Sequence, residues 1–231
     1  MKEIKDQEQL LSYIQDFQLE SVFHEPLFPH LSLYSFEQGE LICSQGEASQ
    51  YLYVLVKGKL KIYTSSHEGN TLILSFQKPL ELIGDIEYVQ GIDIINTVEA
   101  VSPVTMIGIH QRWLKKYGSD HAPLLRFLLD VITKKFYLKN NSMSLNIMNP
   151  VEVRLASYLL SVTLDEFDSL FKNQINISIK DAANLIGTSA RHLNRVIKHL
   201  CSVGLIERNK GTILVKDREG LRKLAGDNIY E

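Results

Sequence analysis

Hydrophobic positions follow a helical spacing near both ends of the chain and a strand-like spacing between them. Four apolar residues near the start recur at helical intervals and predict a helix over about residues 5–20: Leu10, Leu11, Ile14 and Phe17. Between about residues 31 and 110, short runs rich in β-branched and aromatic residues alternate with turns marked by glycine. Regularly spaced short strands with such turns predict an all-β sandwich or barrel. We therefore expect a β-roll with a small helix in front of it.

Helical spacing returns after Gly118 as two neighbouring apolar stripes. The first stripe is an a/d seam with intervals of four, three and four residues: Leu125, Leu129, Ile132 and Phe136. The second stripe lies beside it: Leu124, Leu128, Val131 and Leu138. Such a helix can pack on its own domain with one stripe and on a partner with the other, and two-fold dimers are the commonest oligomers. The pattern predicts a homodimer through the seam, and the alternative is a helix buried within one subunit.

The stretch NISIKDAANLIGTSARHLNRVIKHL reads as two short helices separated by a glycine turn. Ser178 followed by Asp181 is typical of a capping box, Gly187 turns the chain, and Thr188 or Ser189 caps the second helix. The expected inner face of the first helix consists of Ile179, Ala182, Ala183 and Ile186. Two short strands joined by the turn RNKG follow as a hairpin. This order predicts a winged helix-turn-helix, and the alternative is two helices that simply pack together.

The outer face of the second helix carries basic and polar side chains with no acidic residue among them. In a helix-turn-helix the second helix lies in the major groove, with its first residues on base edges. Arg191 and Arg195 match the bidentate reading of guanine, and Asn194 matches the reading of adenine. Thr188, Lys198 and Lys210 suit phosphate contacts, which position without specifying. The predicted DNA-binding residues are Lys180, Thr188, Ser189, Ala190, Arg191, His192, Asn194, Arg195, Lys198 and Lys210.

Charge is divided unevenly along the chain. Residues 1–110 contain six lysines, no arginine and fifteen acidic residues, a net charge of −9, whereas residues 111–231 carry +7. Between residues 180 and 216 there are seven basic and two acidic residues. An acidic half joined to a basic half indicates that the basic half meets an anion, and the alternative is a chance split.

Several other classes of protein are not expected from this sequence. Cys43 and Cys201 lie far apart, so they suggest no disulfide framework and form no CxxC for zinc or a redox pair, and two thiolates are too few for a four-cysteine iron–sulfur site. The absence of HxH, HExxH, GxSxG and a phosphate-cradling glycine loop argues against a cupin-type or other enzyme, and we expect no metal. No apolar run approaches the length of a membrane span, and the charged N-terminus does not resemble a signal peptide, which favours a cytoplasmic protein without a membrane partner. Cys43 is expected to be a small buried residue on a strand, with a redox role as the alternative.

Three stretches follow one another in an order that covers nearly the whole chain: QGELICSQGEASQYLYVLVKGKLKIYTSSHEGN, LELIGDIE and ISIKDAANLIGTSARHLNRVIKHLCSVGLIERNKGTILV. They are similar to the β-roll, the start of the phosphate-binding cassette and the winged helix-turn-helix of the CRP/FNR superfamily of bacterial transcription regulators, and most resemble its YeiL-like branch. The resemblance implies an α+β fold with a jelly-roll, cyclic-nucleotide-binding-like sensor domain. The expected divisions are residues 1–118 for the N-terminal helix and β-roll, 119–147 for the dimerisation helix and 148–231 for the winged helix-turn-helix domain.

The cassette departs from the cyclic-nucleotide-binding members of that family. In those members a Gly-Glu pair takes the ribose hydroxyl, and an Arg-Ser or Arg-Thr pair takes the cyclic phosphate. Here Gly-Asp stands at the first position and Ile-Ile at about the second, and the first arginine of the chain is Arg112. A buried phosphodiester without a cation is under-compensated, so we expect no tight binding of cAMP and no evident cofactor. The candidate effector-pocket residues are Gly84, Asp85, Ile94, Ile95, Asn96 and Thr97. They form either a packed remnant or a pocket for a different, more apolar small-molecule effector.

These observations predict a sequence-specific DNA-binding regulator that acts as a homodimer on palindromic double-stranded DNA. The alternative is a ligand-binding or protein-interaction module that has lost DNA binding, and the intact basic face argues against it. RNA polymerase is a further candidate partner, and the sequence leaves activation and repression open. A signal is expected to shift the packing between the β-roll and helical residues 121–145. That shift would rotate the recognition helices toward or away from a spacing of about 34 Å.

Overall fold

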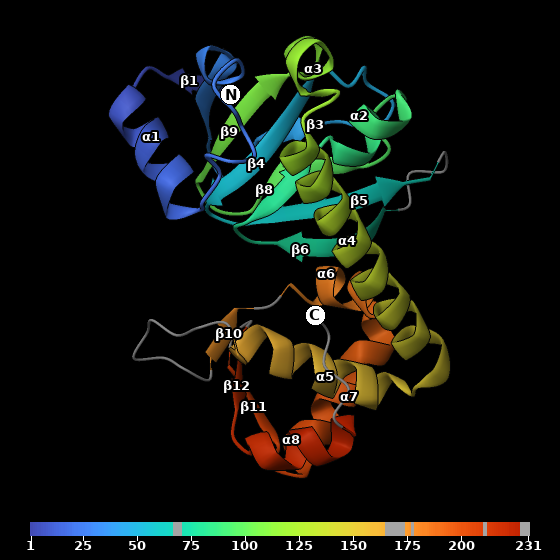
Figure 1. Cartoon of the computed structure of the whole chain (residues 1–231). Helices are drawn as coiled ribbons and strands as arrows, with labels where there is room; N and C mark the ends of the chain where they lie inside the picture. Colours follow the sequence, from blue (N-terminus) through green and yellow to red (C-terminus); the bar gives the residue numbers. More distant parts are fainter. Residues whose placement is uncertain (67–70, 165–173, 177, 210–211, 227–231) are drawn as a thin grey trace. The chain divides into compact units, whose positions relative to one another are not determined.

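The computed structural model describes residues 1–66, 71–164, 174–176, 178–209 and 212–226 (Figure 1). The chain divides into two compact units, residues 1–135 and 136–231. The division falls inside the long helix α4 (Ala122–Met148). The domain limits that the sequence suggested, near residues 118 and 147, stay a prediction.

Unit 1 is built on two antiparallel sheets, as the sequence predicts for a β-roll. The five-stranded sheet has the order β1 (Lys2–Ile4), β2 (Leu31–Phe36), β9 (Val104–His110), β4 (Tyr51–Lys57) and β7 (Glu81–Ile83). The four-stranded sheet has the order β3 (Leu41–Cys43), β8 (Thr97–Ala100), β5 (Leu60–Ser65) and β6 (Thr71–Gln77).

Strand β4 shows how unit 1 is held together, because its two faces are buried in two different cores. Successive side chains of a strand point to opposite faces of its sheet. Leu52 and Val54 pack with helix α1 (Gln7–Asp16) and with the start of α4. Tyr53 and Leu55 pack in the second core, together with residues of the four-stranded sheet. The near-continuous apolar run of β4 therefore reflects burial on both sides.

The other helical elements of unit 1 are short. They are the 3-10 turn Phe28–His30, α2 (Asp85–Gln90), α3 (Gln111–Trp113) and the π-helical turn Leu114–Gly118. Helix α1 is shorter than the helix predicted over about residues 5–20. It begins at Gln7 because Asp6 caps it by accepting a hydrogen bond from the Gln9 N–H at 2.9 Å, and it ends at Asp16, just before Gln18 takes a φ of 54°. Neither β1 nor α2 was predicted from the sequence.

Unit 2 has a helical core with a three-stranded sheet. Its helices after α4 are α5 (Val151–Leu164), α6 (Ile179–Leu185), α7 (Ala190–Ser202) and α8 (Arg218–Ala225). The sheet has the order β10 (Gln174–Asn176), β12 (Thr212–Val215) and β11 (Ile206–Asn209). The predicted inner faces are confirmed, since the apolar residues of α6 and α7 pack in one core with α5 and α8. The α+β class is confirmed, although β10 and α8 were not predicted.

Candidate nucleic-acid interface and effector cavity

Helices α6 and α7 are defined by the capping groups that the sequence indicated. The Ser178 hydroxyl oxygen accepts from the Asp181 N–H at 3.3 Å, and the Ser189 hydroxyl oxygen accepts from the His192 N–H at 3.2 Å. Between the helices, Gly187 has a φ of 65°, which favours glycine. Ser189, and not Thr188, is therefore the N-cap of α7.

Helix α7 separates its apolar and basic residues completely. Leu193, Val196, Ile197 and Leu200 are buried in the core of unit 2. Arg191, Arg195 and Lys198 are exposed, and none of them is in an ion pair with another described residue. Helix α7 therefore presents an uncompensated cationic surface.

The remaining predicted DNA-binding residues surround this surface or fall outside the description. Ser189, Ala190 and His192 are exposed in the first turn of α7 and at its cap, and Lys180 is exposed on α6. Thr188 is half-buried in the turn before α7. Lys210, which was predicted to contact phosphate from the hairpin, lies outside the described residues.

Asn194 is half-buried and both ends of its amide are engaged. Its Oδ1 accepts from Nη1 of Arg208 at 2.7 Å, and its Nδ2 donates to the Ala190 carbonyl at 2.9 Å. Arg208 comes from strand β11 of the wing and is exposed. It was not among the predicted DNA-binding residues, because no local pattern indicates a contact between residues fourteen positions apart.

The turn between α6 and α7 is held by residues from outside the motif. Arg154 of α5 donates from Nη1 to the carbonyl oxygens of Ile186 at 2.6 Å and Gly187 at 3.2 Å. Asn146, near the end of α4, donates to the Leu185 carbonyl at 3.4 Å. These contacts occupy carbonyls that the end of α6 leaves without helical partners. The orientation of α7 is thus tied to α4 and α5.

The long helix α4 leaves its predicted seam largely uncovered in the single chain. Leu125 is 43%, Leu129 64% and Phe136 68% exposed, and Ile132 is half-buried. Two residues of the second stripe, Leu124 and Leu128, are buried in the core of unit 1, so this stripe packs on its own domain as predicted.

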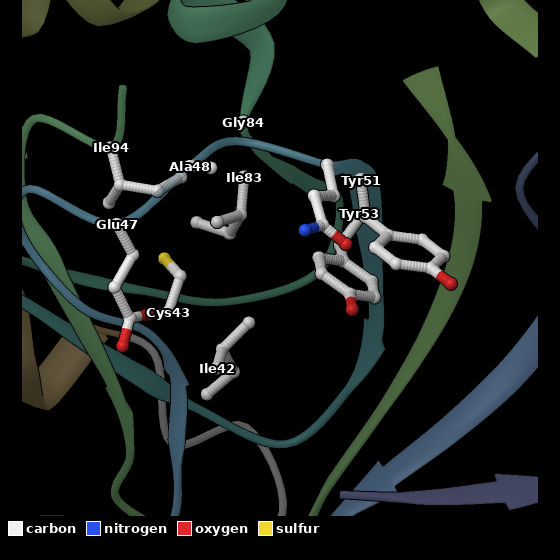
Figure 2. Close-up of a pocket in the computed structure, with 10 residues that line it drawn as sticks. Ile42, Cys43, Glu47, Ala48, Tyr51, Tyr53, Ile83, Gly84 and Ile94 are labelled. Carbon is white, nitrogen blue, oxygen red and sulfur yellow. The ribbon is translucent and has the colours of Figure 1, made fainter. Parts of the chain in front are cut away.

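Unit 1 contains a cavity of about 300 Å³ inside the β-roll (Figure 2). Its lining consists of Ile42, Cys43, Glu47, Ala48, Gln50, Tyr51, Tyr53, Ile83, Gly84 and Ile94. Of the six candidate effector residues, only Gly84 and Ile94 line it. Gly84 has a φ of 87°, and a Cβ there would strike the Tyr51 carbonyl oxygen, so backbone packing alone requires glycine.

The other four candidates are used elsewhere or lie at the surface. The Thr97 hydroxyl accepts from the Gln45 N–H at 3.1 Å, and the Asn96 carbonyl accepts weakly from the Cys43 thiol at 3.9 Å. Ile95 is 38% exposed. Asp85 is buried beside the long helix rather than at the cavity.

The described lining of the cavity is unfavourable for negative charge. It contains the carboxylate of Glu47, and no lysine, arginine or histidine is among the described residues that line it. Burial, followed by the charge of the nearby Glu87, raises the pKa of the Cys43 thiol to about 12. Burial also raises the pKa of Tyr53 above its ordinary value. Burial in the cavity wall thus favours the neutral forms of the Cys43 thiol and the Tyr53 hydroxyl.

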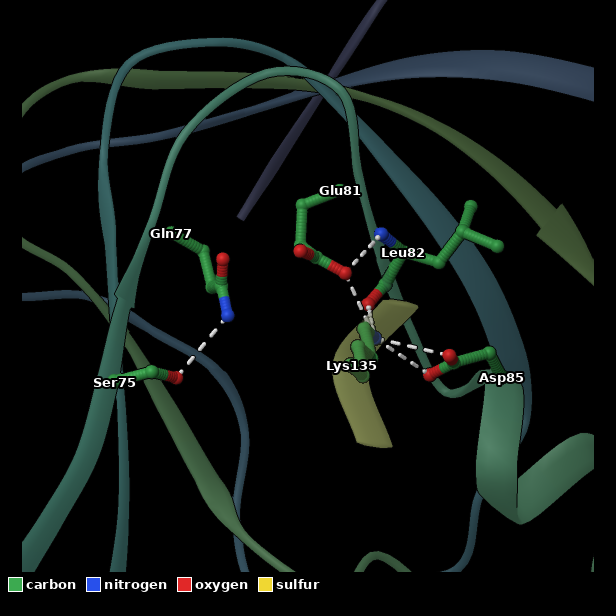
Figure 3. Close-up of polar contacts among 6 residues, drawn as sticks. All are labelled: Ser75, Gln77, Glu81, Leu82, Asp85 and Lys135. Atoms are coloured by element: carbon green, nitrogen blue, oxygen red, sulfur yellow. Dashed lines mark hydrogen bonds and ion pairs between the residues drawn. The ribbon is translucent and has the colours of Figure 1, made fainter. Parts of the chain in front are cut away.

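Asp85 forms part of an ion-paired cluster around Lys135 of α4 (Figure 3). The Lys135 Nζ lies 2.8 Å from Glu81 Oε1 and 2.9 Å from Asp85 Oδ2, and it donates to the Leu82 carbonyl at 2.7 Å. The Asp85 side chain is only 4% exposed. The acidic residue at the position that the family resemblance assigns to ribose binding therefore already has a cationic partner within unit 1.

The part of the chain that the structure describes shows neither a candidate metal site nor a helix that could span a membrane. No group of three or more histidine, cysteine, aspartate and glutamate side chains could hold a metal ion there. No helix among those residues has the length and hydropathy to cross a bilayer.

Each of the two units contains a region that matches a known protein family. Residues 33–118 match the family described as the cyclic nucleotide-binding domain, and residues 153–224 match the Crp-like helix-turn-helix domain. The chain belongs to the CRP/FNR superfamily of transcription regulators. The resemblance read from the sequence is confirmed, and with it the helix-turn-helix character of unit 2.

Individual members of the superfamily are distant relatives of this regulator. Regulatory protein YeiL of Escherichia coli is 24% identical over 193 residues, covering 84% of this chain and 85% of YeiL. A CRP-like cAMP-activated global transcriptional regulator of Mycobacterium tuberculosis is 21% identical over 193 residues, with coverages of 82% and 86%. The solved structure of a putative crp/fnr-family regulator from Eubacterium rectale has a TM-score of 0.78 at 20% identity, with coverages of 93% and 99%.

Proposed function

We propose that this CRP/FNR regulator binds DNA sequence-specifically as a homodimer on a palindromic operator, and that cAMP does not control it. The observation that carries the proposal is the exposed basic face of α7, whose Arg191, Arg195 and Lys198 have no acidic partner among the described residues. Free guanidinium groups at the start of a recognition helix suit the major-groove edge of guanine. DNA as the target implies action in the cytoplasm.

The dimer is proposed from the exposed seam of α4. Leu129 and Phe136 are more than half exposed although both are large and apolar. Leu129 lies four residues after Leu125 and three before Ile132, and Phe136 lies four residues after Ile132. Apolar a/d residues of this kind gain stability by packing against the same residues of a second helix. A two-fold dimer would present its two α7 helices to two half-sites about 34 Å apart.

Independence from cAMP is proposed from the charges of unit 1. A cyclic phosphate in the cavity would meet Glu47 and no cation among the described residues that line it. The Asp85 carboxylate, which would have to accept a ribose hydroxyl, is engaged by Lys135. The free energy lost by burying a phosphate without a cation is far larger than the free energy gained from hydrogen bonds to the attached sugar. The cavity is either a remnant or the site of an uncharged effector, and RNA polymerase remains a candidate partner.

The test is selection from a random-sequence duplex library with the full-length protein, followed by titration of the enriched operator. We expect a two-fold symmetric consensus, and Arg191→Ala should weaken binding by about 10- to 100-fold. Arg112→Ala removes an exposed arginine of unit 1 and serves as the matched control. No enrichment, or equal effects of the two variants, would favour the alternative that this chain is an interaction module without DNA binding.

A further inference from the structure

The contact between Asn194 and Arg208 joins the recognition helix to the wing. Arg208 lies on β11, where its backbone is paired with Ile213 of β12. Its guanidinium Nη1 reaches the Asn194 Oδ1 at 2.7 Å. The wing is thereby linked through a side chain to the same helix that carries Arg191 and Arg195.

Asn194 is poorly placed to read a base in this arrangement. Reading adenine requires an amide that offers both its oxygen and its nitrogen to the base edge. Here the oxygen accepts from Arg208 and the nitrogen donates to the Ala190 carbonyl at 2.9 Å. Asn194 is also half-buried, at the margin of the face whose centre holds the exposed Arg191 and Arg195. These observations favour a positioning role for Asn194.

Arg208 lies at that margin and has more N–H donors than its contact with Asn194 uses. A guanidinium carries five N–H groups in a fixed fork, and the contact with Asn194 uses one nitrogen. Its neighbours on the wing are differently engaged, because Glu207 pairs with Lys216 at 3.5 Å and accepts from Asn209 at 2.9 Å. The margin of a helix lying in the major groove faces the phosphates that border the groove.

We propose that Arg208 contacts an operator phosphate and that Asn194 is the positioning residue that holds its guanidinium ready for that contact. A long side chain that is ordered before binding loses less conformational entropy when it binds. The inference rests on the proposed DNA-binding function. It also revises the sequence-based interpretation of Asn194 as an adenine reader.

A double-mutant cycle on the selected operator tests this coupling. Arg208→Ala should weaken binding by about 5- to 20-fold, the usual range for one charge-assisted contact. Asn194→Ala should weaken it less, and Asn194→Ala combined with Arg208→Ala should be no weaker than Arg208→Ala alone. Additive losses would overturn the proposal. So would a loss of discrimination at a single base pair in Asn194→Ala, measured against operators with each base replaced.

A second variant separates a phosphate contact from a purely structural link. Arg208→Gln keeps an amide donor for Asn194 but removes the charge, so the slope of log affinity against log salt should fall by about one per subunit. An unchanged slope with wild-type affinity would show that Arg208 only braces the wing. Thermal unfolding of each variant excludes misfolding as the cause of lost affinity. Failure of the wild-type protein to bind any DNA would overturn the proposed function itself, and the wild-type titration alone reveals that outcome.

Discussion

The β-roll cassette and the recognition helix treat cationic side chains in opposite ways. At the cassette, Lys135 of α4 is surrounded by two carboxylates and a carbonyl within 3.1 Å of its Nζ. On α7, Arg191 and Arg195 are exposed and no described carboxylate pairs with them. A cation that is neutralised inside the fold holds elements together, whereas one that is left unpaired at the surface is available to an external anion. The comparison supports the proposal that unit 2 is the part of the regulator that binds an anion.

The cassette and α7 also differ in what they would do to a phosphate. The described cavity lining carries Glu47 and no cation, and Glu87, which is near Cys43, is buried. A phosphate placed there would lie beside like charge, while a phosphate at α7 stays partly hydrated and meets Arg191, Arg195 and Lys198. This contrast supports the proposal that the regulator binds DNA and is not controlled by a cyclic nucleotide.

The largest expected effect is on the alkylation rate of Cys43, which tests whether the cavity of the β-roll disfavours an anion. Its pKa of about 12 means that, at pH 9, the native thiol should alkylate roughly 100- to 1000-fold more slowly than the same thiol in the unfolded chain. The sign follows from the raised pKa, because the thiolate is the reactive form and burial disfavours it. Iodoacetamide labelling of the Cys201→Ser variant, with and without urea, measures the ratio. Rapid labelling of the native protein would contradict an anion-excluding cavity and revive a redox role.

The next largest expected effect is the loss of dimerisation when the exposed seam of α4 is made acidic. Leu129→Asp with Phe136→Asp should give a monomer in sedimentation velocity and lower operator affinity by about 100-fold, because the second half-site then binds without a tether. Leu11→Asp is the control, since Leu11 is 50% exposed on α1 and lies outside the seam. A double variant that remains dimeric would remove α4 as the interface.

A smaller effect is expected from the recognition arginines taken singly. Arg195→Ala should cost about 1–3 kcal/mol of operator affinity and relax specificity at one base pair, as expected for a guanine reader. Lys198→Ala should weaken all sequences uniformly, as expected for a phosphate contact. Titration of a panel of operator variants separates the two patterns, and uniform loss in both would reassign Arg195 to the phosphates.

The free energy of unfolding tests whether Lys135 stabilises unit 1 through its ion pairs. Lys135→Met leaves the buried Asp85 without its cation and should lower the free energy of unfolding by about 2 kcal/mol, less than for a fully buried pair since the Lys135 side chain keeps 22% exposure. Adding Asp85→Asn should restore part of that loss. Urea unfolding followed by circular dichroism gives both values, and a neutral Lys135→Met would contradict the role assigned to the cluster.

Most of the fold could be predicted from the sequence, because its signals are local. Strand alternation, the spacing of Leu124 and Leu128, and the capping serines 178 and 189 each act within a few residues. Much of what defines the site could not be predicted. The pairs Asp85–Lys135 and Asn194–Arg208 join elements that are distant in sequence, and no periodicity marks such a contact. The same reason explains why Asp85 was assigned to the pocket, since a motif position does not reveal the partner of its side chain.

The most direct test is a fluorescence anisotropy titration of the full-length protein on its selected operator, at two salt concentrations, with and without millimolar cAMP. We predict selective binding with a steep salt dependence, a slope of about −5 or steeper for a dimer with six or more phosphate contacts. We predict the same affinity with cAMP present, which is the smallest of these effects. Binding that appears only when cAMP is added would contradict the proposed function, because it would require the cavity and the Lys135 cluster to admit a phosphate.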